Sequence, residues 1–203
     1  MSVFRSIIQP LTMLNQFQIV LASQSPRRKE LLMNMGLQFT VHPSSINEEI
    51  PMGIPLENLA QHLAKCKAED VAQYYINNTI VIGSDTTVLL DNELLEKPQN
   101  KEEAFDMLKR LSGKTHEVIS AICVIHNNKT WCCSDTAKVS FDTLQEDEIN
   151  FYIDKYAPFD KAGGYGIQEW IGCIGINHIE GSFYTVMGLP THLLWNVLKQ
   201  INK

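Results

Sequence analysis

The stretch from Gln18 to Gly36 constrains the fold of this chain most, because its pattern favours a strand, a short loop and a helix in that order. Residues 18–22 are a short apolar run of the kind that forms a buried strand. Ser25 stands where a helix N-cap is expected, and Pro26 stands at the first helical position, where its missing N–H costs nothing. Apolar residues then recur up to Gly36, a residue type that commonly ends helices. We therefore expect a strand–loop–helix unit here.

Three cations, Arg27, Arg28 and Lys29, occupy the first turn of this expected helix. At the positive end of the helix dipole, each destabilises the helix by roughly a few tenths of a kcal/mol. One interpretation is a solvated basic turn that tolerates this cost. The other is a phosphate-binding site, in which helix N–H groups and the cations hold an anion. The glycines of a Walker loop or a dinucleotide-binding fingerprint are absent, so neither of those sites is predicted.

Composition and charge exclude several classes of protein. The 203 residues suffice for one domain with a sizeable core or for two small lobes, and 44% apolar with 20% charged residues is ordinary for a globular protein. A formal net charge of −6 argues against a nucleic-acid-binding protein, and no apolar run approaches the roughly eighteen residues of a membrane span. An acidic protein that binds an anion must concentrate its cations locally or recruit a metal ion.

The cysteines and the first residues bear on location and domain organisation. Five cysteines, an odd number without Cys-x-x-Cys spacing, favour reduced thiols and a cytoplasmic protein over a disulfide framework or a zinc site. Residues 1–17 carry Arg5 as their one charged side chain, which is too little basic character for a targeting peptide. We interpret residues 1–17 as an N-terminal extension and residues 18–203 as a single domain with two lobes around a cleft.

The run Thr79–Leu90 has the β-branched composition of a central strand, and Asp85 lies in its middle. A carboxylate there is costly unless it is paired or binds a metal ion, so we favour a functional role over a structural one. Gly83 leaves room for a ligand or another backbone to approach closely. The pair Asp91-Asn92 predicts a tight hairpin, after which residues 93–97 return as a strand and bring Lys97 back toward the surroundings of Asp85.

Residues 56–75 show the apolar spacing of a helix, with Lys67 on its apolar stripe and Lys65 on its polar side. A lysine on the inward stripe either extends its charge to the rim or points into a pocket. In the loop before this helix, Glu48 and Glu49 are adjacent acids. They are either solvated or supply a metal ligand.

The rest of the chain predicts hairpins and helices. A capping box of Asn100 with Glu103 opens a helix, and a second box of Thr143 with Glu146 opens another that runs to Lys155. Residues 117–125 and 130–141 pair around Asn127-Asn128, which puts Cys123 directly across from Cys132 in a non-hydrogen-bonded position; we still expect free thiols. The further expectations are a glycine-rich irregular segment over 160–168, strands over 174–179 and 182–187 around a turn at 180–181, and a helix from Pro190 to Ile201. This alternation indicates a mixed α/β fold with an elongated, mostly antiparallel central sheet flanked by helices.

Six motifs in this order resemble the Maf family of nucleoside triphosphate pyrophosphatases. The resemblance runs from about Gln18 to Leu198 and implies a magnesium-dependent hydrolysis between the α and β phosphates of a nucleotide, with Mg²⁺ or another divalent ion such as Mn²⁺ as cofactor. It also implies an α/β fold similar to that of the inosine triphosphatases and a homodimer. The motifs are Leu21-Ala-Ser-x-Ser-Pro-Arg-Arg28, Gly83-Ser-Asp-Thr86, Glu96-Lys-Pro98, Leu111-Ser-Gly-x-x-His116, Lys161-Ala-Gly-Gly-Tyr-Gly-Ile-Gln168 and Gly188-Leu-Pro190.

The resemblance assigns roles that suit the chemistry of each residue. Asp85 resembles the catalytic acid of the family, as a base toward the attacking water or as a ligand of the metal that activates it. Glu48 matches an acid of an early loop and is the second candidate metal ligand. The residues expected to hold the triphosphate are Ser23, Arg27, Arg28, Lys67 and Lys97.

Two further positions resemble the branch of the family that acts on dTTP and UTP, namely Thr86 and Gln168. A glutamine amide can donate to a carbonyl of thymine or uracil and accept from the neighbouring N–H at once. Gly164 departs from the alanine that is more usual there, which should only loosen the loop. Two other classes remain open: a nucleotide-sensing regulator of cell division with weak turnover, which a complete catalytic set argues against, and a nucleic-acid-binding module, which the net charge argues against.

Overall fold

The computed structural model describes residues 14–47, 50, 53–76 and 78–201. The chain divides into two compact units. The first combines residues 1–85, 121–135 and 188–203, and the second combines residues 86–120 and 136–187. In the part of the chain that the structure describes, no helix is both long enough and apolar enough to cross a membrane.

Among the described residues, seven strands form the sheet, in the order β2-β1-β3-β5-β6-β7, with β4 paired to β3. Strand β1 runs parallel to both β2 and β3, whereas β4 and β7 pair antiparallel with β3 and β6. The two-residue turn between β5 and β6 makes that pair antiparallel as well. The predicted mixed α/β fold with a mostly antiparallel sheet is therefore confirmed. The strands are β1 (Gln18–Leu21), β2 (Thr40–Val41), β3 (Thr79–Leu90), β4 (Glu93–Leu94), β5 (Thr115–His126), β6 (Lys129–Phe141) and β7 (Ile176–Glu180).

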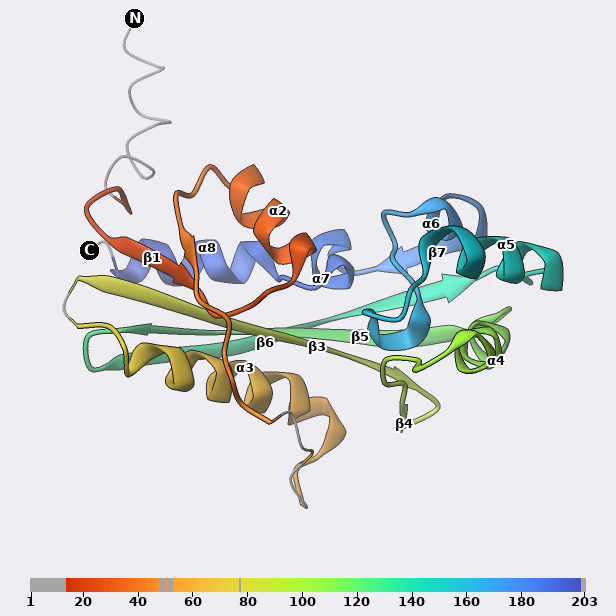
Figure 1. Ribbon diagram of the computed structural model, residues 1–203, viewed down its shortest axis with the longest axis horizontal. Helices are drawn as coiled ribbons and strands as arrows, with labels where there is room; N and C mark the ends of the chain where they lie inside the picture. Colours follow the sequence, from red (N-terminus) through yellow and green to blue (C-terminus); the bar gives the residue numbers. More distant parts are fainter. Residues whose placement is uncertain (1–13, 48–49, 51–52, 77, 202–203) are drawn as a thin grey trace, which may run out of the picture. The chain divides into compact units, whose positions relative to one another are not determined.

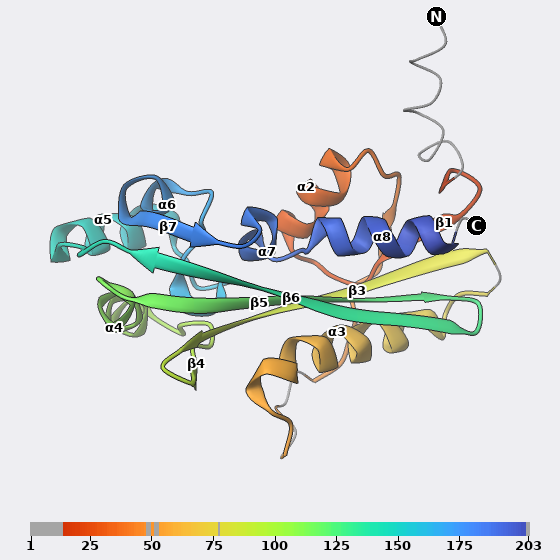
Figure 2. The ribbon, with the colours of Figure 1, turned by 180° about the vertical axis from the view of Figure 1, so that it is seen from behind.

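In the first unit, helices cover both faces of the sheet. Helices α2 (Pro26–Asn34) and α8 (Thr191–Ile201) lie on one face, and α3 (Leu56–Ala72) lies on the other (Figures 1 and 2). On the α3 face, Val20 and Val81 of adjacent strands pack with Val71 of the helix, and all three are buried. This packing buries the continuous apolar runs that the sequence shows in β1 and β3.

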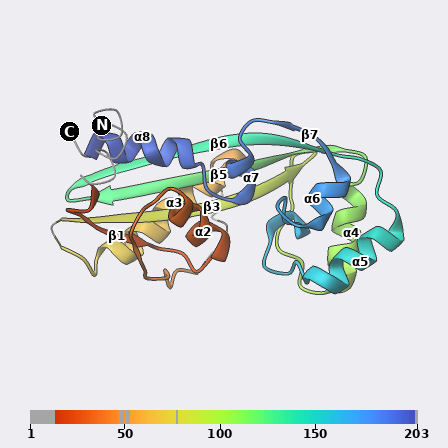
Figure 3. The ribbon, with the colours of Figure 1, turned by 90° about the horizontal axis from the view of Figure 1, so that it is seen from above.

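The second unit holds further helices. Helix α4 (Lys101–Leu111) packs against α5 (Glu146–Tyr156) and against the 3₁₀ turn η1 (Ala162–Gly164). Figure 3 shows α4 beside α5 from above. Two short helices, α6 (Trp170–Gly175) and α7 (Phe183–Met187), lie on either side of β7 in the chain. The Asn100 cap of α4 is confirmed, because its side-chain oxygen accepts a hydrogen bond from the N–H of Glu103 at 2.9 Å.

Three expectations about elements are wrong, two of them because a distant contact prevails and one because a helical turn forms in place of a strand. Helix α5 is capped by Gln145 with Glu148, not by Thr143, since the N–H of Leu144 donates to Ser112 and keeps the chain extended. The chain after Leu95 leaves β3, because the carbonyl of Glu96 accepts from Gly163 of η1. Residues 182–187 are not a strand, because the carbonyl of Ser182 accepts from two N–H groups of α7.

The expectation of five free thiols is also wrong. Cys123 and Cys132 form a disulfide, with an S–S distance of 2.02 Å, and Cys66, Cys133 and Cys173 are free. The register prediction explains this bond. The two residues face each other across the hairpin with their Cα atoms 4.1 Å apart, which is the close spacing of a non-hydrogen-bonded pair.

Candidate functional site

The N-terminus of α2 has the predicted geometry. The Ser25 hydroxyl accepts a hydrogen bond from the N–H of Arg28 at 3.4 Å, and Pro26 opens the helix. Because β1 pairs Leu21 with Ile82, the loop that follows β1 lies beside the middle of β3, where Ser84 and Asp85 stand. The start of α2 therefore sits at the carboxyl end of a parallel strand, a place where α/β proteins commonly bind ligands.

Arg28 is buried, and so it is not part of a solvated turn. Its Nε donates to the carbonyl of Gly188 at 2.9 Å, and its Nη1 donates to the Ser23 hydroxyl at 3.2 Å. The Ser84 hydroxyl donates to the same Gly188 carbonyl at 3.3 Å. Ser23 and Arg28 are thus brought together, while Arg27 is half-buried. A buried, oriented guanidinium beside a helix N-terminus is suited to an anion.

Lys67 and Asp85 form a buried ion pair. The Lys67 Nζ donates to Asp85 Oδ1 at 2.5 Å, and the two side chains are 9% and 11% exposed. Lys67 therefore points into the interior from the apolar stripe of α3 and does not extend to the rim. Removing one partner would leave an uncompensated buried charge, which costs on the order of 3–5 kcal/mol.

Gly83 explains how α3 comes close enough to β3 for this pair. A Cβ added to Gly83 would lie 2.2 Å from the carbonyl oxygen of Ala64 and 2.7 Å from the N–H nitrogen of Ala68. Of the two explanations offered for this glycine, close approach of another backbone is the correct one. Since Lys67 precedes Ala68 directly, the contact brings the ammonium group to Asp85.

Three more of the predicted site residues, Thr86, Lys97 and Gln168, belong to the second unit. Thr86 Oγ1 lies 2.8 Å from Ser120 Oγ, which donates to the carbonyl of Thr185 at 2.7 Å. Lys97 and Gln168 are exposed. As neighbours in a strand, Thr86 and Asp85 point to opposite faces of the sheet. The assignment of Thr86, Lys97 and Gln168 to a nucleotide-binding site stays a prediction.

The sequence analysis missed two buried polar contacts in the second unit. His116 Nε2 lies 2.7 Å from the Tyr165 hydroxyl, and burial lowers the pKa of His116 to about 4. The Tyr152 hydroxyl donates to Glu169, and burial together with this bond raises the pKa of Tyr152. His116 and Tyr165 fall within quoted motifs, which could have singled them out. Tyr152 gave no local signal, since its partner lies 17 positions away.

Of the two predicted metal ligands, Asp85 and Glu48, the structure describes Asp85. Among the described residues, no three His, Cys, Asp or Glu side chains gather closely enough to hold a metal ion. Glu48 lies outside the described residues. A carboxylate such as Asp85 nevertheless suits Mg²⁺, which often takes one or two protein carboxylates and completes its shell with substrate phosphates and water.

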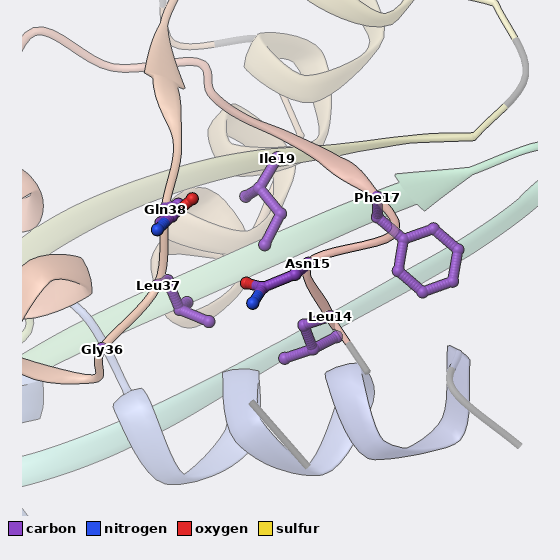
Figure 4. A pocket seen from close by; sticks show the side chains of 7 residues that line it. All are labelled: Leu14, Asn15, Phe17, Ile19, Gly36, Leu37 and Gln38. Carbon is purple, nitrogen blue, oxygen red and sulfur yellow. The ribbon is translucent and has the colours of Figure 1, made fainter. Parts of the chain in front are cut away.

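A small pocket in the first unit contains none of the predicted site residues. It lies next to β1, and Figure 4 shows the mixture of apolar and amide side chains around it. Its lining is Leu14, Asn15, Phe17, Ile19, Gly36, Leu37 and Gln38.

Comparison with known proteins identifies the family. The model of a family described as Maf-like protein matches residues 18–201. A Porphyromonas gingivalis protein named dTTP/UTP pyrophosphatase is 46% identical over 193 residues, covering 94% of this chain and 97% of that protein. Proteins of the same name from Flavobacterium psychrophilum and Bacteroides thetaiotaomicron are 45% and 42% identical, covering 88% and 93% of this chain and 91% and 98% of their own lengths. Among solved structures, the Staphylococcus aureus Ham1 protein is 15% identical, with a TM-score of 0.49 over 91% of this chain and 99% of that one. Since the family model spans nearly the whole chain and these relatives are more than 40% identical to it, the chain belongs to the Maf family.

Proposed function

We propose that this protein hydrolyses nucleoside triphosphates, foremost dTTP and UTP, to the nucleoside monophosphate and pyrophosphate. The observation that carries this proposal is the buried Lys67–Asp85 pair at 2.5 Å, in the same compact unit as the basic N-terminus of α2. The names of the relatives supply the substrate class.

Asp85 acts on the attacking water in this proposal. A carboxylate held in place by Lys67 can accept the proton that the water loses as it attacks phosphorus. Catalysis of phosphoryl transfer depends mainly on positioning the reacting groups and on neutralising the charge of the phosphates. The N–H groups of α2 with Ser23, Arg27 and Arg28 supply both for the phosphates, and the remaining cations are Lys67 and Lys97.

The same carboxylate is our candidate ligand for a divalent cation, with Glu48 as the second. The ion, Mg²⁺ or Mn²⁺, would neutralise phosphate charge and lower the pKa of a bound water. We also propose that the protein acts as a cytoplasmic homodimer, without nucleic-acid or membrane partners.

Gln168 and Thr86 select the base in this proposal. Thymine and uracil present a carbonyl, an N–H and a second carbonyl on one edge, and a glutamine amide can pair with two of these groups. Thr86 is short and leaves room near the ribose and phosphates.

The experiment that tests the proposed function measures kcat/KM for UTP, dTTP, CTP, GTP and 7-methyl-GTP, with and without Mg²⁺. The products are identified by phosphorus NMR as monophosphate and pyrophosphate or as diphosphate and phosphate. UTP and dTTP should give the highest values, and each should yield pyrophosphate. Release of inorganic phosphate as the first product, or a preference for a purine, would overturn the proposal.

Replacing Gln168 with glutamate should weaken the selection of pyrimidines. The change keeps the size of the side chain but places an acceptor against a carbonyl oxygen, which costs on the order of 1–3 kcal/mol, or about tenfold to a hundredfold in kcat/KM. UTP and dTTP should suffer this loss, whereas GTP, whose edge presents N–H groups, should suffer less. An equal loss on every base would show that Gln168 does not contact the base.

A further inference from the structure

A buried hydrogen-bond network surrounds the segment that carries Gln168. The Tyr152 hydroxyl, on α5, donates to one carboxylate oxygen of Glu169 and accepts the N–H of Gly166 at 2.9 Å. The other carboxylate oxygen of Glu169 lies 3.2 Å from the Nζ of Lys161, whose side chain is 8% exposed. Tyr152 itself is fully buried. The Tyr152 hydroxyl therefore joins Gly166 to Glu169. The ammonium group of Lys161 ties the first residue of the segment 161–169 to the last.

Close packing inside the segment leaves its backbone little freedom. The carboxylate of Glu169 lies so near Gly166 that an added Cβ would stand 2.8 Å from its Cδ. A Cβ on Gly172 would lie 1.8 Å from the carbonyl oxygen of Ile167. The carboxylate of Glu169 cannot move without breaking the network, and the backbone of Ile167 packs against Gly172, so the turn at Ile167 and Gln168 is confined from both sides.

Gln168 is the exception within this packed segment. Ile167 before it is 6% exposed and Glu169 after it is held by two polar partners, yet Gln168 itself is exposed. The network therefore fixes the backbone on both sides of one outward-pointing amide. An amide that must donate and accept at the same time needs such orientation, because a misplacement of about 1 Å can cost on the order of a hundredfold in rate.

We propose that Glu169, held by Tyr152 and Lys161, is a positioning residue that orients Gln168 toward the base. The inference rests on the proposed function and adds residues that contact no substrate. Loss of the network should reduce the preference for UTP over GTP, while a purely structural role would lower both activities together.

The test compares Tyr152→Phe with Tyr156→Phe as a matched control. Tyr152→Phe removes the hydroxyl that joins Glu169 to Gly166 and leaves the ring in place. Tyr156 stacks on Tyr152 from the same helix, with ring centroids 5.1 Å apart, so its hydroxyl tests a nonspecific effect. The ratio of kcat/KM for UTP to that for GTP should fall on the order of tenfold in Tyr152→Phe and stay at the wild-type value in Tyr156→Phe.

Two further variants separate positioning from stability. Glu169→Gln keeps an acceptor for Tyr152 and should retain most of the preference, whereas Glu169→Ala should lose it. In a Gln168→Ala background, Tyr152→Phe should change the ratio no further, because residues that act through one group are not additive. An unchanged ratio in Tyr152→Phe, or an equal fall in the Gln168→Ala background, would overturn the inference.

The wild-type enzyme distinguishes the two possible failures. If it hydrolyses no nucleotide to pyrophosphate, the proposed function fails and the positioning role falls with it. If it prefers UTP and Gln168→Ala loses that preference while Tyr152→Phe keeps it, the proposed function stands and only the positioning role is wrong.

Discussion

Arg27 and Arg28 are neighbours in the sequence, but they meet different surroundings. Arg28 is buried and donates to Ser23 and to the carbonyl of Gly188, whereas Arg27 is half-buried. A guanidinium that already holds two parts of the chain together is costly to remove, because its acceptors are left unsatisfied in the interior. The sequence placed both cations at a helix N-terminus but could not tell which of them the fold also needs.

The disulfide predicts how many cysteine thiols can react with a thiol reagent. Because Cys123 and Cys132 are bonded, three of the five cysteines should react with a thiol reagent in denaturant without reductant, and all five should react after reduction. Cys132→Ser should raise the count without reductant to four, since it frees Cys123. Five reactive thiols in unreduced wild-type protein would contradict the bond.

His116 should make the protein less stable in acid. Burial lowers its pKa from an ordinary 6.5 to about 4, so between these values the unfolded chain holds a proton that the folded chain does not. The free energy of unfolding therefore falls as the pH falls through this range, by about 1.4 kcal/mol for each pH unit. The protonated ring would also bury an N–H at Nδ1, an atom without a hydrogen-bond partner in the described structure.

His116→Gln removes this titration and can still bond to the Tyr165 hydroxyl. Urea unfolding at several pH values between 4 and 7 should show a shallower pH dependence in the variant, by close to one proton. Equal slopes in the two proteins would mean that His116 does not titrate as its burial implies.

At the scale of elements, Gly83 is the contact that brings α3 onto β3. Gly83→Ala would force a methyl group into the backbone of α3, with a built Cβ only 2.2 Å from the carbonyl oxygen of Ala64. The helix must move away, so we expect a loss of about 1–3 kcal/mol in the free energy of unfolding, together with a loss of turnover as Lys67 leaves Asp85. Ser84→Ala, on the opposite face of the strand, should cost only about 1 kcal/mol. Similar unfolding midpoints for Gly83→Ala and wild type would contradict this packing.

Sequence patterns predicted elements where the signal is local. The Ser25 cap and Pro26 start α2 as expected, and the run of β-branched residues gives the bounds of β3. The start of α5 was predicted wrongly because its contact with Ser112 lies 32 positions away. Residues 182–187 were predicted wrongly because an apolar run this short is compatible with either a strand or a helix, and here it forms the turns of α7. The site shows the same division. The apolar stripe placed Lys67 on the inward side of its helix but left open whether its charge extends to the rim or enters the interior, and no pattern indicated that it pairs with Asp85.

At the scale of the whole molecule, the family model covers residues 18–201, which agrees with the extent of the resemblance seen in the motifs. The predicted site residues are divided between the two compact units. The Lys67–Asp85 ion pair and the α2 N-terminus belong to the first unit, and Thr86, Lys97 and Gln168 belong to the second. The residues that orient Gln168 came from the structure alone, because Tyr152 and Glu169 meet only after folding.

Asp85→Asn tests the catalytic proposal most directly. The amide keeps the shape of the side chain but removes the base, so kcat/KM for UTP should fall on the order of a hundredfold or more. The assay is run on material whose near-ultraviolet circular dichroism matches that of wild type, because Lys67 loses its buried partner and the variant should be less stable. A folded Asp85→Asn protein that keeps more than about a tenth of the wild-type kcat/KM would contradict the role of Asp85.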